Sequence, residues 1–233
     1  MTGGTPPVWL VTMAWTALAV AVVSAAVIVI DVRRYRQQMP VMAWVWPVTA
    51  LYTGPLGIWA YLRFGRPHSQ RWSEERGMAE PPPKPRWATT SVGVSHCGAG
   101  CTLGDIIAGT TIFLLGITLL GKALWAELVG DYLLAVALGL VFQYFAIAPA
   151  RGLGLRDGLV AAAKADILSL TAFEVGLFAW MVFQALVLFP EPDPVRPDSP
   201  VYWFGMQVGM CLGFVTAYPV NAWLISRGVK EAM

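Results

Sequence analysis

The sequence has few charged residues and very few histidines and cysteines. Only 13% of its 233 residues are Asp, Glu, Lys or Arg, and it contains two histidines and three cysteines. Three cysteines are too few for a secreted scaffold held together by disulfides, and two histidines are too few for paired bis-histidine haem sites. The net charge of +2 comes without a basic face interleaved with aromatic residues, so we do not expect nucleic acid as a partner.

The motifs of several large enzyme classes are also missing. The chain has no phosphate-binding Walker loop, dinucleotide fingerprint, nucleophile elbow or His-Glu-x-x-His zinc motif. We therefore favour a binding or transport protein over an enzyme.

Long apolar runs dominate what is present, because 57% of the residues are hydrophobic. A helix that crosses a bilayer needs about 20 apolar residues. Six runs are long enough, at about 8–30, 41–62, 97–120, 132–149, 163–189 and 201–225. The sequence thus predicts one all-α domain over 1–233, a polytopic transmembrane helix bundle of about six spans that sits in the lipid of the inner (plasma) membrane.

The second run is the exception, because it contains Pro47 and the pair Gly54-Pro55. Proline removes a helical hydrogen bond and kinks or breaks a helix. The run is therefore either a complete span or a broken, re-entrant helix, which membranes tolerate where protein covers the backbone.

The connection 63–94 is the only long polar segment, and it carries six Lys or Arg residues. Cytoplasmic loops are rich in Lys and Arg, so we place this connection inside, which with six spans puts both termini in the cytoplasm. The cluster Arg33, Arg34 and Arg36 then lies outside, against the same rule. A re-entrant second run would remove this conflict.

Two cysteines and a carboxylate lie at helical spacing in the third run. Cys97, Cys101 and Asp105 recur every four residues, so a helix places them on one face. Thiolates, with the neighbouring imidazole of His96, are ligands for soft metals such as copper(I). Helical Cβ atoms four residues apart are about 5–6 Å apart, wider than the roughly 3.5–4.5 Å of a disulfide, so a regular helix favours a metal.

The same segment allows two other interpretations. Gly98 and Gly100 could make the backbone irregular, and Cys97 and Cys101 could then cycle between dithiol and disulfide. Alternatively the cysteines are small buried hydrophobes, and Gly100, Gly104 and Ala108 form a close-packing ridge.

The sixth run adds two further soft side chains, Met206 and Met210, one helical turn apart. Thioethers bind soft metals, although methionine also fills gaps in apolar cores. Beside them Gly205, Gly209 and Gly213 recur every four residues, a pattern typical of close helix packing. We expect these glycines to pack against another helix, either within the chain or in a second copy of it in a homo-oligomer.

Ionisable residues inside apolar runs need a partner or a function. Glu174 lies deepest, so we predict that it handles protons or charge, and Asp105 is a second candidate for this role. Lys164 and Asp166 lie nearer the start of the fifth run, where Lys164 can reach the interface. Lys164 could pair with Asp166 or with Asp105.

These residues lead to one main hypothesis and two alternatives. The main hypothesis is an integral membrane protein that binds or transports copper(I) or another soft metal ion. Its predicted ligands are His96, Cys97, Cys101, Met206 and Met210. The alternatives are a membrane thiol-disulfide oxidoreductase that passes electrons to a quinone, and a structural subunit of a membrane complex.

The chain also resembles a known family. The string Ser95 to Asp105, the segments Lys164 to Asp166 and Glu174 to Phe178, and the closing Thr216 to Asn221 are similar to the bacterial and archaeal membrane family called domain of unknown function 4396. The resemblance runs from about Ala43 to the C-terminus. It implies that these motifs belong to one family pattern, and it implies no activity or substrate.

Overall fold

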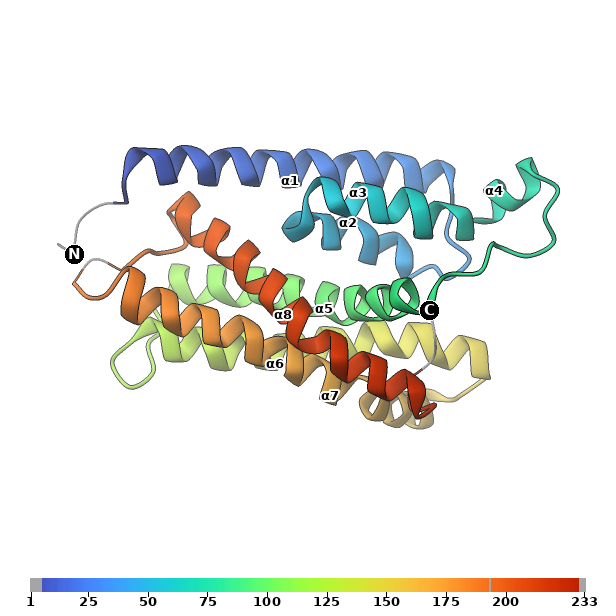
Figure 1. Cartoon of the computed structure of the whole chain (residues 1–233). Coiled ribbons are helices and arrows are strands. Elements are labelled where there is room, and N and C mark those ends of the chain that lie inside the picture. Colours follow the sequence, from blue (N-terminus) through green and yellow to red (C-terminus); the bar gives the residue numbers. More distant parts are fainter. Residues whose placement is uncertain (1–5, 193, 231–233) are drawn as a thin grey trace.

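The computed structural model describes residues 6–192 and 194–230, and these form a bundle of helices without a strand (Figure 1). The predicted all-α bundle is confirmed. Its α-helices are α1 (Val8–Arg34), α2 (Met42–Thr53), α3 (Pro55–Ala60), α4 (Gln70–Glu75), α5 (Arg86–Leu115), α6 (Ala123–Arg151), α7 (Leu155–Phe183) and α8 (Pro200–Ser226). Two π-helical turns, Tyr61–Gly65 and Gln184–Leu188, continue α3 and α7, and a 3-10 turn, Arg66–His68, follows the first.

Five of these helices, α1, α5, α6, α7 and α8, are long and apolar enough to cross a membrane. Their outward faces carry large exposed apolar side chains such as Val23, Ile30 and Leu133. A surface of this kind suits hydrocarbon rather than water. These helices indicate a membrane protein.

The second apolar run is broken, as the re-entrant alternative predicted. Gly54 has φ +56° and ψ −130° and separates α2 from α3, which begins at Pro55. A positive φ is favourable for glycine, and Pro55 has no N–H to donate back into α2. After this turn α3 runs back beside α2 toward the end of the bundle where α2 began (Figure 1). We call this unit, 42–60, the hairpin.

Because the hairpin returns, α1 begins and α8 ends at opposite ends of the bundle (Figure 1). The expectation that both termini share one side required a complete second span. The end where α8 finishes also holds the end of α1, the 63–86 connection and the turn between α6 and α7 (Figure 1). These segments carry the Arg33 to Arg36 cluster, Arg151 and Arg156, and we call this end the basic end. Only two cationic residues, Lys122 and Arg196, belong to connections at the opposite end.

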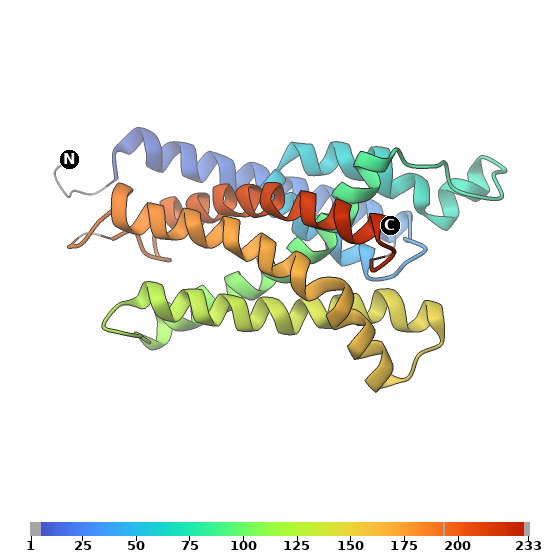
Figure 2. The same cartoon turned by 60° about the horizontal axis from the view of Figure 1, so that its bottom comes forward.

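Helix α5 lies at the centre, packed against α2, α6, α7 and α8 (Figure 2). Its contact with α6 is very close, because a Cβ added to Gly100 would lie 2.9 Å from the Gly139 backbone. A Cβ added to Gly104 would lie 2.7 Å from the backbone nitrogen of Ala135. These glycines thus form the packing ridge that the sequence suggested.

The glycines of α8 also pack within the chain. Added Cβ atoms on Gly205, Gly209 and Gly213 would all meet residues of α7 or of the π-helical turn that continues it. This stripe therefore serves the α7–α8 contact, and homo-oligomerisation through it stays an untested prediction.

Candidate functional site

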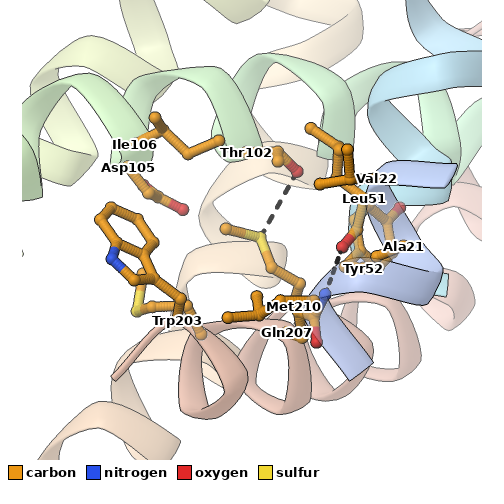
Figure 3. A pocket seen from close by; sticks show the side chains of 12 residues that line it. Ala21, Val22, Leu51, Tyr52, Thr102, Asp105, Ile106, Trp203, Gln207 and Met210 are labelled. Atoms are coloured by element: carbon orange, nitrogen blue, oxygen red, sulfur yellow. Dashed lines mark hydrogen bonds between the residues drawn. The ribbon is translucent and has the colours of Figure 1, made fainter. Parts of the chain in front are cut away.

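A cavity of about 140 Å³ lies where the tip of the hairpin meets α1, α5 and α8. Most of its lining is apolar, and its few polar groups come from α2, α5 and α8 (Figure 3). It is lined by Leu18, Ala21, Val22, Leu51, Tyr52, Thr102, Asp105, Ile106, Trp203, Met206, Gln207 and Met210. We call it the central cavity.

Polar side chains of α8 hold the hairpin tip in place. The break at Gly54 leaves the last carbonyls of α2 without helical donors, which is costly within a membrane. Gln207 donates from Nε2 to the carbonyl oxygen of Leu51 at 2.7 Å, and Cys211 donates to that of Tyr52 at 3.6 Å. The polar positions of α8 thus explain how a broken helix is tolerated at this depth.

The central cavity combines a carboxylate with thioethers. Asp105 is 1% exposed, and neither of its oxygens has a hydrogen-bond partner. Met210 accepts a hydrogen bond from Thr102 at 3.5 Å (Figure 3), and Met206 lines the cavity one turn away. The predicted pairing of Asp105 with Lys164 is wrong, because the Asp105 oxygens are unpartnered and Lys164 is exposed. An unpaired buried carboxyl beside soft sulfur atoms is the chemistry expected where a cation binds.

A second polar cluster lies toward the basic end, around Cys97. Its thiol lies 2.7 Å from Asp166 Oδ1 and 3.1 Å from Ser169 Oγ. The ammonium of Lys230 donates to Cys97 Sγ at 2.7 Å and to Asp166 Oδ1 at 2.9 Å. Asn221 donates to Ser169 and completes the cluster. We call these five residues the lysine cluster.

A helix-ending turn delivers Lys230 into this cluster. Gly228 has φ +68°, its N–H donates to Ile225, and the N–H of Val229 donates to Leu224. This pattern is a Schellman motif, which reverses the chain at the end of α8. The sequence suggested Lys164 as a partner for Asp166 and did not identify Lys230, since nothing local distinguishes a lysine that turns inward after a helix.

Four carboxyl groups, contributed by α5, α6 and α7, also lie close enough to interact. Glu174 interacts electrostatically with Asp105, Asp131 and Cys101, and Asp131 also interacts with Glu127. The oxygens of Asp131 and Glu174, like those of Asp105, have no hydrogen-bond partner. The sequence identified Glu174 and Asp105 but missed Glu127 and Asp131, because the fourth apolar run was started at Tyr132. The four-residue spacing of the two α6 acids was the available signal.

The predicted metal ligands lie in three places instead of one. Cys97 and Cys101 both face α7, whereas His96 packs against Phe142 of α6 with neither ring nitrogen hydrogen-bonded. Met206 and Met210 line the central cavity. Within residues 6–192 and 194–230, no three His, Cys, Asp or Glu side chains are close enough to share a metal ion.

Backbone register explains the position of His96. Gly100 lies against Gly139 and Gly104 against Ala135, so the next turn of these antiparallel helices places His96 opposite Gln143. The side chain of Gln143 is fully buried, and like that of His96 it has no hydrogen-bond partner. The two therefore mark a third polar level, between α5 and α6.

The cysteines are all free thiols. Cys97 and Cys101 lie in a continuous α-helix that includes Gly98 and Gly100. The non-helical backbone that a disulfide between them requires is therefore not present at this segment.

Comparisons with known proteins place the chain in one family. A family described as a domain of unknown function, DUF4396, matches residues 86–230, a region that begins at α5 and ends at Lys230. The match starts later than the resemblance from Ala43 suggested, and it includes both the lysine cluster and the carboxyl groups. No curated protein and no solved structure was found to match. Because the match covers more than half of its length, the chain belongs to the DUF4396 family.

Proposed function

We propose that this protein is a membrane transporter that binds a soft metal cation, copper(I) being the first to test. The observation that carries the proposal is the central cavity, where Met206 and Met210 share one apolar space with the unpaired carboxyl of Asp105. Thioethers select copper(I) among common metal ions, and a carboxylate balances its charge.

The architecture around the cavity supports transport over storage. In many transporters, substrate sites lie near the middle of the membrane beside discontinuous helices. Here the hairpin tip forms one wall of the cavity, and α8 holds its carbonyls. In this proposal Cys101, one turn from Asp105 on α5, and Glu174, the α7 residue beside it, handle the ion or its charge, with Cys97 one turn beyond.

We further propose that the basic end faces the cytoplasm of a cell whose inner membrane holds the protein. Cytoplasmic connections are enriched in Lys and Arg, and the hairpin brings the Arg33 to Arg36 cluster to the same end as the 63–86 connection. The conflict that a complete second span created then disappears. In this orientation α1 begins outside and α8 ends inside.

Copper(I) binding by purified protein, measured by competition with a chromogenic copper(I) chelator, tests the proposal. The double variant Met206→Leu, Met210→Leu keeps the side-chain volume but removes both sulfur atoms, and it should bind at least about tenfold more weakly. The control is Met13→Leu, because Met13 is an exposed methionine on α1. Equal affinity in the double variant and the control would remove the central cavity as the metal site.

Transport is then measured by copper(I) uptake into proteoliposomes loaded with a copper-sensitive dye. The variant Asp105→Asn keeps the shape of the side chain but removes its charge, so uptake should fall. Uptake equal to that of the wild type would show that Asp105 does not balance the charge of the ion.

A further inference from the structure

A second and larger cavity, of about 580 Å³, opens at the end of the bundle opposite to the basic end. It is bounded by the 116–122 connection, the π-helical turn Gln184–Leu188, residues 189–191 and 194–197 of the next connection, and the start of α8. We call it the vestibule. Its walls carry Glu127, Met181 and Gln184, whose oxygen and sulfur atoms can bind a cation. Lys122 and Arg196 also line it.

One residue connects the two cavities, because Met206 lines both the vestibule and the central cavity. Its neighbours along α8 divide between the two spaces: Tyr202 lines the vestibule and Trp203 lines the central cavity. Met206 is only 5% exposed, so its side chain is buried between the two cavities. Methionine is flexible and unbranched, which suits a side chain that must move to let an ion pass.

The vestibule wall near Met206 is held in shape. Tyr202 donates from its hydroxyl to Glu127 at 3.2 Å, and a Cβ added to Gly109 would lie 2.9 Å from that hydroxyl. The glycine of α5 therefore leaves room for the tyrosine, which in turn fixes the carboxylate. A carboxylate near the inner part of an open vestibule attracts cations toward the passage.

Toward the basic end, the lysine cluster places a buried cation among α5, α7 and the segment after α8. The Lys230 side chain is 0% exposed and contacts Cys97 and Asp166. A buried ammonium repels an approaching cation. It also already contacts Cys97 Sγ and Asp166 Oδ1, the atoms to which a cation would bind. The vestibule therefore opens at one end of the bundle, and the buried Lys230 ammonium lies toward the other.

We infer that the vestibule is the route by which the cation reaches the central cavity, and that Met206 is the gate between them. This inference rests on the proposed function and adds the direction of loading. The ion passes from Glu127 and Met181 to Met206, and then to Met210 and Asp105. Release at the basic end requires a second arrangement in which Lys230 leaves Asp166.

The route is tested with silver(I), a soft monovalent ion without redox chemistry, on protein in lipid nanodiscs. Cys211, which is exposed, is replaced by serine as background. Thr118→Cys in the vestibule and Glu80→Cys in the connection at the basic end are each labelled with a bulky maleimide. Silver arrival is followed by the fluorescence of Trp203, isolated as the difference from a Trp203→Phe variant.

The label at Thr118→Cys should slow silver(I) association by about tenfold or more, whereas the label at Glu80→Cys leaves the rate unchanged. Equal rates with both labels, at unchanged affinity, would overturn the route while leaving the proposed function intact. If silver(I) and copper(I) do not bind even the unlabelled protein, the proposed function fails and the route fails with it.

A measurement without metal separates the gate from the ligand role of Met206. Met206→Cys and Met210→Cys, in the same Cys211→Ser background, are treated with a small cationic methanethiosulfonate. Position 206 faces the vestibule and should react faster than position 210, and the maleimide at Thr118→Cys should protect it. Faster reaction at position 210, or no protection, would contradict the order of the two residues along the path.

Discussion

Lys230 and Asp166 form an ion pair inside the bundle, with Nζ 2.9 Å from Oδ1 and their side chains 0% and 1% exposed. The pair joins the segment after α8 to the middle of α7, and the thiol of Cys97 brings α5 into the same contact. Two charges taken out of water are tolerated when they pair and hydrogen-bond well, and losing one partner leaves the other uncompensated.

Lys230→Met should therefore lower the free energy of unfolding by about 3–5 kcal/mol, because Asp166 is left as an unpaired buried charge. The double variant Lys230→Met, Asp166→Asn removes both charges and should recover much of this loss. Denaturation in detergent measures each step. The matched control is Lys164→Met, an exposed lysine of α7, and equal losses at the two lysines would contradict the buried pair.

The pH dependence of stability gives an independent test of Lys230. Burial alone lowers the pKa of Lys230, but Asp166 and Cys97 raise it by more, so its pKa lies above the ordinary value. A raised pKa contributes stability that is complete below the ordinary lysine pKa of about 10.4 and is lost as the pH rises through the folded-state pKa. The wild type should therefore lose stability above about pH 10.4.

This alkaline loss should be smaller in Lys230→Met, which has no ammonium to titrate, and unchanged in Lys164→Met. Denaturation curves collected across the alkaline range supply the comparison. A loss in Lys230→Met as steep as that of the wild type would mean that other groups cause it.

Close packing of α5 on α6 makes Gly104 sensitive to one methyl group. A Cβ at this position would lie 2.7 Å from the backbone nitrogen and 3.0 Å from the Cα of Ala135, and backbone atoms cannot move aside as a flexible side chain can. We expect Gly104→Ala to cost about 1–3 kcal/mol, as overpacked cores do. Gly154→Ala is the control, because nothing lies within 4 Å of its Cβ. Equal thermal stability of the two variants would show that α6 can retreat.

The sequence predicted the parts of this structure that local chemistry determines. Apolar length identified five long helices, although α5 begins at Arg86 instead of about 97 and α6 at Ala123 instead of about 132. Four-residue spacing predicted that Cys97, Cys101 and Asp105 share a face, and all three are buried on α5. The pair Gly54-Pro55 marked the broken run. Partners across the bundle could not be predicted in the same way. Lys230 meets Asp166 from 64 residues away through a turn after α8, and only the three-dimensional packing brings them together.

Orientation in the membrane is tested by placing reporters at the two ends of the bundle. A cysteine introduced at Glu80, at the basic end, should be protected from a membrane-impermeant reagent in intact cells, whereas one at Asp198 should be labelled. A tag after α8 should read as cytoplasmic and a tag before α1 as extracytoplasmic, because the hairpin does not complete a crossing. Both tags on one side would require the hairpin to be a full span.

Two buried carboxyls, one on α5 and one on α6, have no hydrogen-bond partner. Asp105 and Asp131 are 1% and 0% exposed, and none of their oxygens has a hydrogen-bond partner. A buried carboxyl without a partner costs free energy, and natural proteins retain such groups where function needs them. Asp105→Asn and Asp131→Asn keep the shape of each side chain and remove the charge, so each should leave thermal stability equal to or higher than that of the wild type.

Asp105→Asn should at the same time weaken copper(I) binding, because Asp105 lines the central cavity, whereas Asp131 does not. Stability and binding are measured on the same preparations, with Asp157→Asn, at an exposed position in the first turn of α7, as the control. A large loss of stability in Asp105→Asn would instead identify this carboxyl as a structural partner and remove it from the proposed site.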